Sequence, residues 1–472
     1  MFRVVLVGVT LFAGVLAGRS PHANLVDQFQ NSPDSSRFSS DVFEDARLDI
    51  ESLIRKYQYP FEAHNVVTSD GYILTAHRIP HGRDRNNQPG PRPAVLVLHG
   101  LLSSSADFVT LGPGNALSYF LAEEGYDVWL LNARGNTFSR NHTIMDPDRR
   151  GDAEFWMYSW DEIGSLDLPA YIDYILETTG QEKVHYIGHS QGGTSFLVMS
   201  ASRPEYNEKI ISFLGLAPAA YFHNNENTFF LVMSPYERVL DVSTISKKLI
   251  LLYNFFLISL NMIQLLQSIH LPSYLGTRYF RTHVVTVFLQ ALASQLGIGE
   301  VLGQSDILSF ITFNFCRDGA LTQPLCLLLF VNDQNADYFN STMLPVFLGH
   351  APAGAAFRQV LHYAQSIKFG TFSRYNFGTL QNLYIYGRVT PPPYDMSRVT
   401  VRTNLHYGLN DVEAHWRDIL FLSEILPNAR AIQAPRPSFT HYDFIWGIDA
   451  KEQVYETAIE MMREAERPLI IK

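Results

Sequence analysis

Hydrophobic and polar positions alternate between two kinds of segment over much of the chain. The run 94–98 is apolar on both faces, which is typical of a central strand in a parallel sheet, and 127–131 and 184–187 also have the pattern of strands. Between them, apolar residues recur at helical spacing around 116–124 and 161–177. Strands that alternate with helices predict an α/β fold with a mostly parallel central sheet and helices on both faces. Ligands of such sheets bind at the carboxyl ends of the strands.

The same pattern predicts the domain organisation. Ordered structure is expected from Asp49, and the alternation stops after Pro218. It resumes at 399–405, with a further strand at 429–434 and a last helix over roughly 451–466. We therefore expect a core made of 49–218 and 398–472, and a large, mainly helical inserted cap over 219–397.

The N-terminus has the features of a targeting sequence. Residues 1–18 contain one arginine, an apolar run and two small residues at the end, which is typical of a cleaved signal peptide. The apolar run is short for a membrane anchor, the alternative, because a spanning helix needs about 20 apolar residues. Residues 19–48 are polar and predict a flexible leader or propeptide. We therefore expect a protein of the secretory pathway, either secreted or lysosomal.

Secretion affects what the cysteines and sequons predict. An oxidising compartment favours a disulfide between Cys316 and Cys326 over two free buried thiols. Asn141 and Asn340 each begin an Asn-X-Thr sequon, which is open to glycosylation if it lies on the surface. The 36 basic and 46 acidic residues give a formal net charge of −10, which argues against a nucleic-acid partner.

Residues 249–266 form an apolar stretch that is long enough to cross a bilayer. Two asparagines, a serine and a glutamine interrupt it, and polar groups in hydrocarbon need partners. The stretch therefore favours a buried or lipid-facing cap helix over a membrane span, and no stable transmembrane anchor is expected.

The strongest local signal is the G-x-S-x-G pattern at 188–192, known as a nucleophile elbow. An apolar strand precedes it and a helical pattern follows, which is the context that this motif requires. The sharp turn would expose the hydroxyl of Ser190 above the sheet, while Gly188 and Gly192 allow backbone segments to approach closely. The alternative is a glycine-rich turn without chemistry.

A serine nucleophile needs a histidine base and an acid that orients it, in the chain order serine, acid, histidine for this kind of fold. Asp411 follows a late strand and is the leading acid, whereas the competing Asp418 falls within a helical pattern. His441 follows the next strand and is the leading base. His406 and His415 are alternatives, but they lie before or beside the acid.

Main-chain N–H groups would stabilise the oxyanion of the intermediate. Gln191, next to the nucleophile, is one expected donor, and Leu101, in the loop after the strand 94–98, is the other. The segment 146–151 faintly resembles a calcium loop, but Met157 stands where a bidentate glutamate is needed. We therefore expect no metal and no cofactor.

Together these residues resemble the acid lipase family of the α/β-hydrolase fold, which includes gastric lipase and lysosomal acid lipase. The resemblance covers most of the chain from about residue 50, and the matching blocks are 67–74, 99–102, 125–130, 134–136, 154–156, 188–192 and 441–446. It implies a triad of Ser190, Asp411 and His441, oxyanion donors at Leu101 and Gln191, and a mobile lid. It also implies that Cys316 and Cys326 stand where the family has its cap disulfide.

The family resemblance implies a lipase that hydrolyses triacylglycerols or cholesteryl esters at a lipid–water interface through an acyl-enzyme. A carboxylesterase of small soluble esters would use the same triad, but the large apolar cap favours lipid. An inactive lipid-binding homologue should have lost a triad residue, and none is lost. The chain departs from the family pattern near 230–285, where it is longer; this segment is either an enlarged lid or a retained intron.

Overall fold

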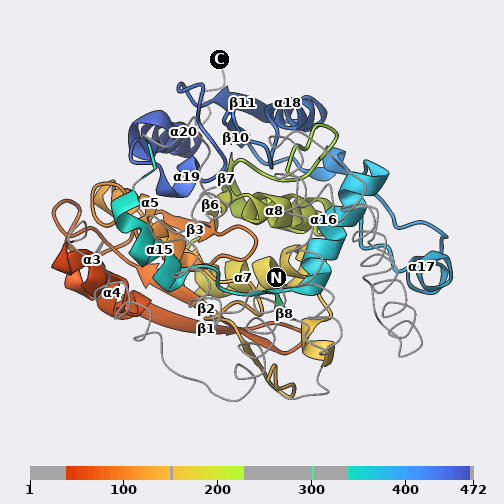
Figure 1. The fold of residues 1–472 in the computed structure, drawn as a ribbon, viewed down its shortest axis with the longest axis horizontal. Coiled ribbons are helices and arrows are strands. Elements are labelled where there is room, and N and C mark those ends of the chain that lie inside the picture. Colours follow the sequence, from red (N-terminus) through yellow and green to blue (C-terminus); the bar gives the residue numbers. More distant parts are fainter. Residues whose placement is uncertain (1–38, 149–152, 228–299, 302–337, 340, 468–472) are drawn as a thin grey trace, which may run out of the picture.

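The computed structural model describes residues 39–148, 153–227, 300–301, 338–339 and 341–467 (Figure 1). These residues form a nine-stranded sheet with the order β1-β2-β4-β3-β6-β7-β10-β11, and β5 pairs with β2. The strands are β1 (Glu62–Val67), β2 (Tyr72–Ile79), β3 (Ala94–Leu98), β4 (Asp127–Leu131), β5 (Asn141–His142), β6 (Val184–His189), β7 (Ile210–Leu216), β10 (Thr403–Tyr407) and β11 (Ala429–Gln433).

The central part of this sheet is parallel. β4, β3, β6, β7, β10 and β11 all run in the same direction, while β1, β2 and β5 make antiparallel pairs at one side. Every residue of β3, β4 and β6 is buried, which explains why these strands are mostly apolar. The α/β class predicted from the hydrophobic pattern is therefore confirmed.

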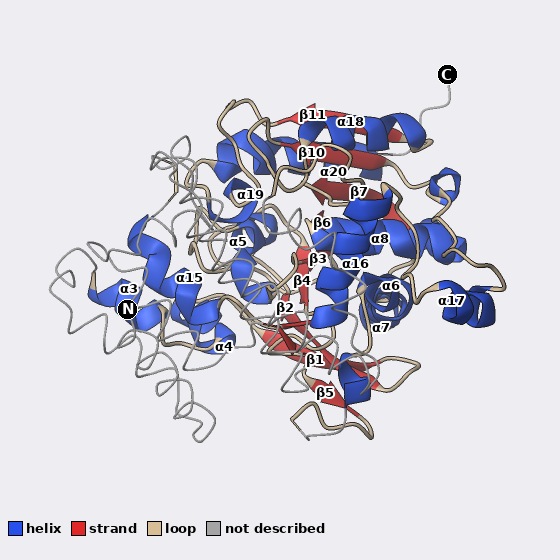
Figure 2. Cartoon of the chain, turned by 45° about the vertical axis from the view of Figure 1, so that its right-hand side comes forward, coloured by secondary structure: helices blue, strands red, loops and turns tan. Residues whose placement is uncertain are grey.

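Helices cover both faces of the sheet. In Figure 2 the sheet is seen nearly edge-on, with α5 on one side and α7 and α8 on the other. The helices of the core are α5 (Leu117–Glu123), α6 (Trp160–Glu162), α7 (Leu168–Thr179), α8 (Gln191–Ser202), α18 (Trp416–Ile425), α19 (Asp443–Trp446) and α20 (Glu456–Glu466). Short 3-10 turns lie at Ser105–Phe108, Ala153–Trp156, Pro204–Lys209, Ser341–Met343 and Met396–Arg398.

Two expected helices contain a wider turn. The helix predicted over 161–177 begins in α6 with a capping box between Ser159 and Glu162, passes through a π-helical segment at Ile163–Asp167 and continues as α7. The helix predicted over 451–466 likewise begins with a π-helical segment, Lys451–Tyr455, before α20. The hydrophobic pattern located both helices but not the change in their winding.

The flexible leader predicted over 19–48 is wrong for its last part, because α3 (Ser40–Asp45) is already folded. Ser39 caps this helix by accepting a hydrogen bond from the main-chain N–H of Val42, and Val42 and Phe43 are buried. Two buried apolar side chains are too few for a periodic signal, which explains why the predicted boundary came too late in the chain. The next helix is α4 (Ile50–Lys56). The signal peptide predicted at 1–18 lies outside the described residues.

Part of the region expected to be a cap is described, and it is mainly helical. It contains α15 (Leu344–His350), α16 (Phe357–Phe369), α17 (Thr379–Tyr386) and a two-stranded pair of β8 (Glu300–Val301) with β9 (Ala355–Ala356). The extra segment near 230–285, the apolar stretch 249–266, Cys316, Cys326 and Asn340 lie outside the described residues. Within the described ranges, no helix combines the length and the apolar character that crossing a membrane requires.

Candidate active site

Ser190 stands at the junction between the end of β6 and the start of α8. Its backbone has φ 51° and ψ −115°, a strained conformation for a residue with a side chain. The turn is fixed from both sides, because Ser190 N–H donates to the carbonyl of Leu216 at 2.9 Å and the Ser190 carbonyl accepts from Gly193 at 3.0 Å. The strand–turn–helix context expected of the nucleophile elbow is therefore present.

The glycines of the motif are needed for close packing. A Cβ atom at Gly188 would lie 2.5 Å from the carbonyl carbon of Gly192, and one at Gly192 would collide with the carbonyl of Leu98. Larger residues at either position would push the elbow away from the sheet. Both glycines therefore allow β6 and α8 to meet at the angle that exposes position 190.

The loop after β3 lies directly against the nucleophile position. A Cβ atom at Gly100 would stand 3.2 Å from the Cβ of Ser190. His99 holds this loop, because its Nδ1–H donates to the Gly100 carbonyl at 2.7 Å and its Nε2 accepts from the N–H of Ala133 at 3.1 Å. Burial lowers the pKa of His99 to about 4, so the ring is neutral and can do both.

The two expected oxyanion donors flank this contact. Leu101 follows Gly100 in the loop, and Gln191 is the first residue of α8. The N–H of a first helical residue has no carbonyl partner within its own helix, so it is available to a ligand. The cap reaches the same place, since the side chain of Gln191 donates to Gln359 of α16 at 2.6 Å.

Asp411 lies in the loop that follows β10 and is buried. Its Oδ1 accepts the main-chain N–H groups of Glu413 and Ala414, both at 2.8 Å, and its Oδ2 lies 2.8 Å from Nδ1 of His441. These bonds fix the carboxylate on one side of the imidazole. The structure thus brings together the acid and the histidine predicted from chain order.

His441 lies in the loop that leads into α19, and its backbone is tied to the elbow. Nε2 of His189, the residue before Ser190, donates to the His441 carbonyl at 3.0 Å. The rings of His189 and His441 also lie 4.9 Å apart, centroid to centroid. His441 is therefore held next to the nucleophile position, although no hydrogen bond between the Ser190 hydroxyl and His441 occurs among the described residues.

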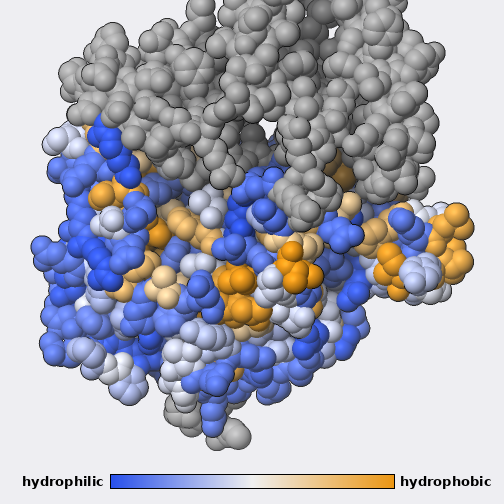
Figure 3. Space-filling model, turned by 90° about the horizontal axis from the view of Figure 1, so that it is seen from below, coloured by the Kyte–Doolittle hydropathy of each residue, from blue (hydrophilic) through white to orange (hydrophobic). Residues whose placement is uncertain are grey.

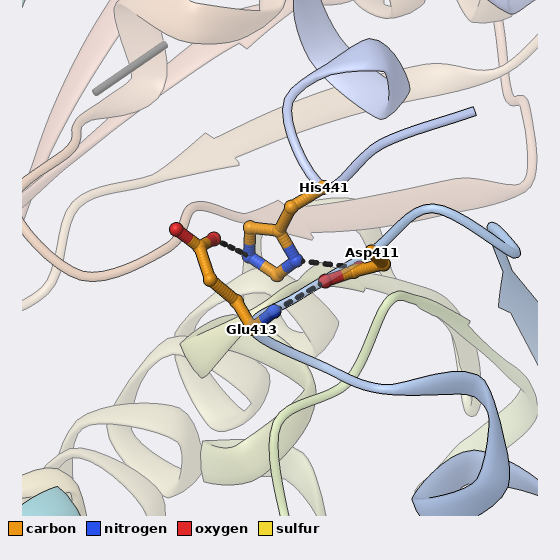
Figure 4. A group of neighbouring side chains, drawn as sticks. All are labelled: Asp411, Glu413 and His441. Atoms are coloured by element: carbon orange, nitrogen blue, oxygen red, sulfur yellow. Dashed lines mark hydrogen bonds and ion pairs between the residues drawn. The ribbon is translucent and has the colours of Figure 1, made fainter. Parts of the chain in front are cut away.

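A second carboxylate, which was not predicted, contacts the other nitrogen of the same imidazole. Oε2 of Glu413 lies 3.3 Å from Nε2 of His441, so the ring stands between Glu413 and Asp411 (Figure 4). Burial lowers the pKa of His441, but the two carboxylates outweigh it and raise the pKa to about 9. In this arrangement the protonated ring is favoured at neutral pH.

The competing residues have other roles in the fold. Asp418 accepts hydrogen bonds from the main chain and side chain of Asn224, at 3.0 and 2.8 Å. His415 caps α18 by accepting the N–H of Arg417, and His406 is buried within β10. Neither histidine therefore takes the place of His441 beside Asp411.

Asp411, Glu413 and His441 are also close enough to be considered as metal ligands. One ligating atom of each can be chosen so that all lie within 4.8 Å of one another. Two of these contacts are already ion pairs between a carboxylate and the imidazole. A cation there would occupy the nitrogens that an acid–base pair needs, so we interpret this group as an acid–base site.

The sequence is similar to that of known lipases. A family described as a partial alpha/beta-hydrolase lipase region matches residues 50–112, and the alpha/beta hydrolase fold family matches 93–232. Lipase 1 of Drosophila melanogaster is 37% identical over 435 residues, covering 91% of this chain and 83% of the relative. The gastric triacylglycerol lipases of Rattus norvegicus and Mus musculus are 35% and 36% identical over 422 residues, covering 89% of this chain and 93% of each relative.

The chain belongs to the acid lipase family of α/β-hydrolases.

Membership confirms three predictions made from the sequence: the fold class, the enzyme class of a carboxylic ester hydrolase, and the function of a serine lipase that hydrolyses lipid esters. The catalytic roles within this acid lipase remain assignments from geometry. Sequence reasoning located Ser190, Asp411 and His441 by motif and order, but it missed Glu413 and His189. Glu413 stands two positions after Asp411. The sequence shows an acidic residue at this position, but the direction in which its side chain points depends on the path of the loop.

Proposed function

We propose that this acid lipase hydrolyses neutral-lipid esters with Ser190 as nucleophile, His441 as general base and Asp411 as the acid that orients it. The observation that carries the proposal is the 2.8 Å contact of Asp411 with Nδ1 of His441, in a loop hydrogen-bonded to the residue before Ser190. Asp411 fixes the tautomer with the proton on Nδ1, so that Nε2 is the nitrogen that accepts the serine proton in the reaction.

The reaction proceeds in two halves. The Ser190 oxygen attacks the ester carbonyl while Nε2 of His441 accepts the hydroxyl proton, and the tetrahedral oxyanion is bound by the N–H groups of Leu101 and Gln191. His441 then donates the proton to the departing alkoxide, which leaves as the alcohol. The acyl group stays bound to Ser190 as an acyl-enzyme. Water attacks the acyl-enzyme with the same base, and the fatty acid leaves as Ser190 regains its proton.

The substrate that we propose is a triacylglycerol or a cholesteryl ester at a lipid–water interface. The relatives from Rattus norvegicus and Mus musculus, among others, carry the name gastric triacylglycerol lipase. Helix α17, in the described part of the cap, also exposes a patch of apolar side chains at the right of Figure 3, with Tyr384 92% and Leu380 83% exposed. An exposed apolar patch of this kind suits contact with lipid and is unnecessary for a soluble ester.

A carboxylesterase is the second candidate, because its triad would be the same. The two differ in how activity depends on the physical state of the substrate. A lipase gains activity when a long-chain ester passes from dissolved to emulsified form, whereas an esterase does not.

We further propose that residues 1–18 direct the protein into the secretory pathway and are then removed, and that 219–397 acts as its cap. A glycan on Asn141 is compatible with the fold, since this residue is exposed on β5. We also propose a glycan on Asn340 and a disulfide between Cys316 and Cys326. Peptide mapping of the secreted protein, with and without reduction, would test these modifications together.

The direct test of the nucleophile is Ser190→Ala, measured on emulsified long-chain triacylglycerol. We expect lipase activity to fall to background while the thermal unfolding curve stays the same, because the substitution removes one hydroxyl from a preserved turn. Unchanged turnover in this variant would refute the assignment.

A further inference from the structure

Glu413 is a largely buried carboxylate for which the proposed reaction has no use. Its side chain is 18% exposed, and its Oε2 lies 3.3 Å from Nε2 of His441. Its Oε1 accepts hydrogen bonds from Nδ2 of Asn227 at 3.0 Å and from the hydroxyl of Tyr442 at 3.3 Å. Both carboxylate oxygens are therefore engaged, and the side chain is held in one orientation.

The position of Glu413 conflicts with the work of His441 in the proposed reaction. Asp411 already occupies Nδ1, so Nε2 is the nitrogen left to take the proton from Ser190. Nε2 instead faces Glu413, and a nitrogen paired with a carboxylate carries a proton and cannot accept another. In this conformation His441 is held by two carboxylates and is unable to act as a base.

The hold on His441 is connected to the segment that leads from β7 into the cap. Besides the Asn227 contact, the Asn225 side chain donates to the Glu413 carbonyl at 2.8 Å, and the N–H of Glu226 donates to the Val412 carbonyl at 3.0 Å. Residues 225–227 thus form a strap that binds both the main chain and the side chain of the Glu413 loop. We call residues 225–227 the cap strap.

The charged and titratable groups around the imidazole come from four places. The loop after β10 supplies Asp411 and Glu413, and β6 supplies His189, whose pKa is lowered well below its usual value by burial and by His441. Tyr442 faces Glu413 from the histidine loop. Asp107, in the 3-10 turn after β3, acts on Tyr442, and burial raises its own pKa to about 7.

Of these groups, Glu413 is the one paired with Nε2, so its charge decides whether Nε2 carries a proton. Burial raises the pKa of Glu413, His441 lowers it, and Asp411 raises it again. His189 is neutral, so it adds no charge next to the ring. Removing the negative charge of Glu413 leaves only Asp411 to favour the imidazolium, and the pKa of His441 should fall.

We propose that Glu413 is a positioning residue that holds Nε2 of His441 away from Ser190 in a resting state, and that the cap strap keeps it there. This inference rests on the proposed triad. Substrate that enters beneath the cap would displace the strap, Glu413 would move off Nε2, and the proton on Nε2 would leave to solvent. His441 would then be free to accept the proton of the Ser190 hydroxyl.

The test is Glu413→Gln, studied with a phosphonate that labels active-site serines and with a dissolved ester for kcat/KM. The pH dependence of kcat/KM reports the pKa of the free enzyme's base. Because one opposite charge nearby raises the pKa of a histidine by about 1 unit or more, we expect the acidic limb of Glu413→Gln to lie about 1 unit lower. At a pH about 1 unit below the wild-type limb, labelling should be about fivefold faster, and the ratio should approach about tenfold at lower pH.

Glu226→Gln is the matched control, because it removes a negative charge from the cap strap without touching His441. Its limb and labelling rate should equal those of the wild type. Asn227→Ala should move both readouts in the same direction as Glu413→Gln, since it removes a donor that holds the carboxylate. If Glu413→Gln fails to fold, Glu413→Leu provides the same test with an apolar side chain.

Several results would overturn the inference. An unchanged limb and labelling rate in Glu413→Gln, with Ser190 still labelled, would refute the resting-state hold and leave the triad standing. If the acidic limb and the labelling rate change in Glu413→Gln but not in Asn227→Ala, the cap strap does not hold Glu413 in place. Failure of the phosphonate to label Ser190 in the wild type would refute the proposed function itself.

Discussion

The substitution Asp411→Asn tests how the acid acts on the histidine without disturbing the loop. Asn keeps an oxygen that can accept the two N–H groups, of Glu413 and Ala414, now bound at 2.8 Å. Its amide nitrogen then takes the place of Oδ2 and points an N–H at Nδ1 of His441. Nδ1 must therefore accept, which moves the ring proton to Nε2, where it blocks general-base catalysis.

The expected loss follows from the wrong tautomer and from the lost charge. Replacing the acid by its amide in a serine triad costs about 10⁴-fold in kcat, or about 5 kcal/mol of transition-state stabilisation. The pKa of His441, now about 9 with both carboxylates present, should fall as well, because Asp411 is the first charge that raises it. The assay is kcat on a dissolved ester, together with thermal unfolding.

Asp418→Asn is the matched control for this prediction. Asp418 is also a buried aspartate of the same region, but it bonds to Asn224 and not to His441. This variant should keep most of its activity. The reasoning is refuted if Asp411→Asn keeps more than about 1% of the wild-type kcat, given the 10⁴-fold expectation, or if the two variants lose activity equally.

Two further predictions concern the elbow and α17. Gly192→Ala should lower the free energy of unfolding by at least about 1–3 kcal/mol, because its Cβ would collide with the Leu98 carbonyl, which cannot move out of the sheet. Denaturant unfolding measures this loss. Gly90→Ala is the control and should leave the free energy of unfolding unchanged, because a Cβ there has nothing within 4 Å. Leu380→Ser combined with Tyr384→Ser should weaken activity on emulsified ester about tenfold or more, since burying one large apolar side chain gives about 1.5 kcal/mol or more. Activity on a dissolved ester should stay the same, and an equal loss on both substrates would argue against lipid contact at α17.

The hydrophobic pattern was enough to predict the sheet and the places of the catalytic candidates. A fully buried strand such as β3 is apolar on both faces, so it leaves a clear signal, and β6 is largely apolar for the same reason. Ser190 follows one of them in a motif, and Asp411 and His441 follow two later strands. Chain order and strand ends therefore pointed to these candidates without knowledge of any contact, and the structure brings Asp411 and His441 together at 2.8 Å.

Features set by a few contacts could not be predicted in this way. Helix α3 buries Val42 and Phe43 within six residues, which is too short for periodicity. The π-helical turn at Ile163–Asp167 keeps nearly the apolar spacing of an α-helix, so the sequence pattern does not distinguish the two. Glu413 lies in a loop, and only the path of that loop turns its carboxylate toward Nε2 of His441.

The resting arrangement also explains why the pKa of His441 need not set the working pH range. With both carboxylates in place the pKa of His441 is about 9, so the imidazole is mostly protonated at neutral pH and below. Displacement of Glu413 by substrate would leave the usual pair of Asp411 and His441. Lipase activity on the acid side of neutrality would then require the bound state, and a substrate panel across pH would detect this.

The central claim is that Ser190 forms the acyl-enzyme with the help of His441. Mass spectrometry of the protein after reaction with a lipid-like phosphonate measures this most directly. We expect one label per chain, on the peptide that contains Ser190, with lipase activity lost in parallel, and no label in Ser190→Ala. Two results would contradict the account. One is loss of wild-type activity with the label on another residue, and the other is labelling of Ser190→Ala to the same extent as the wild type.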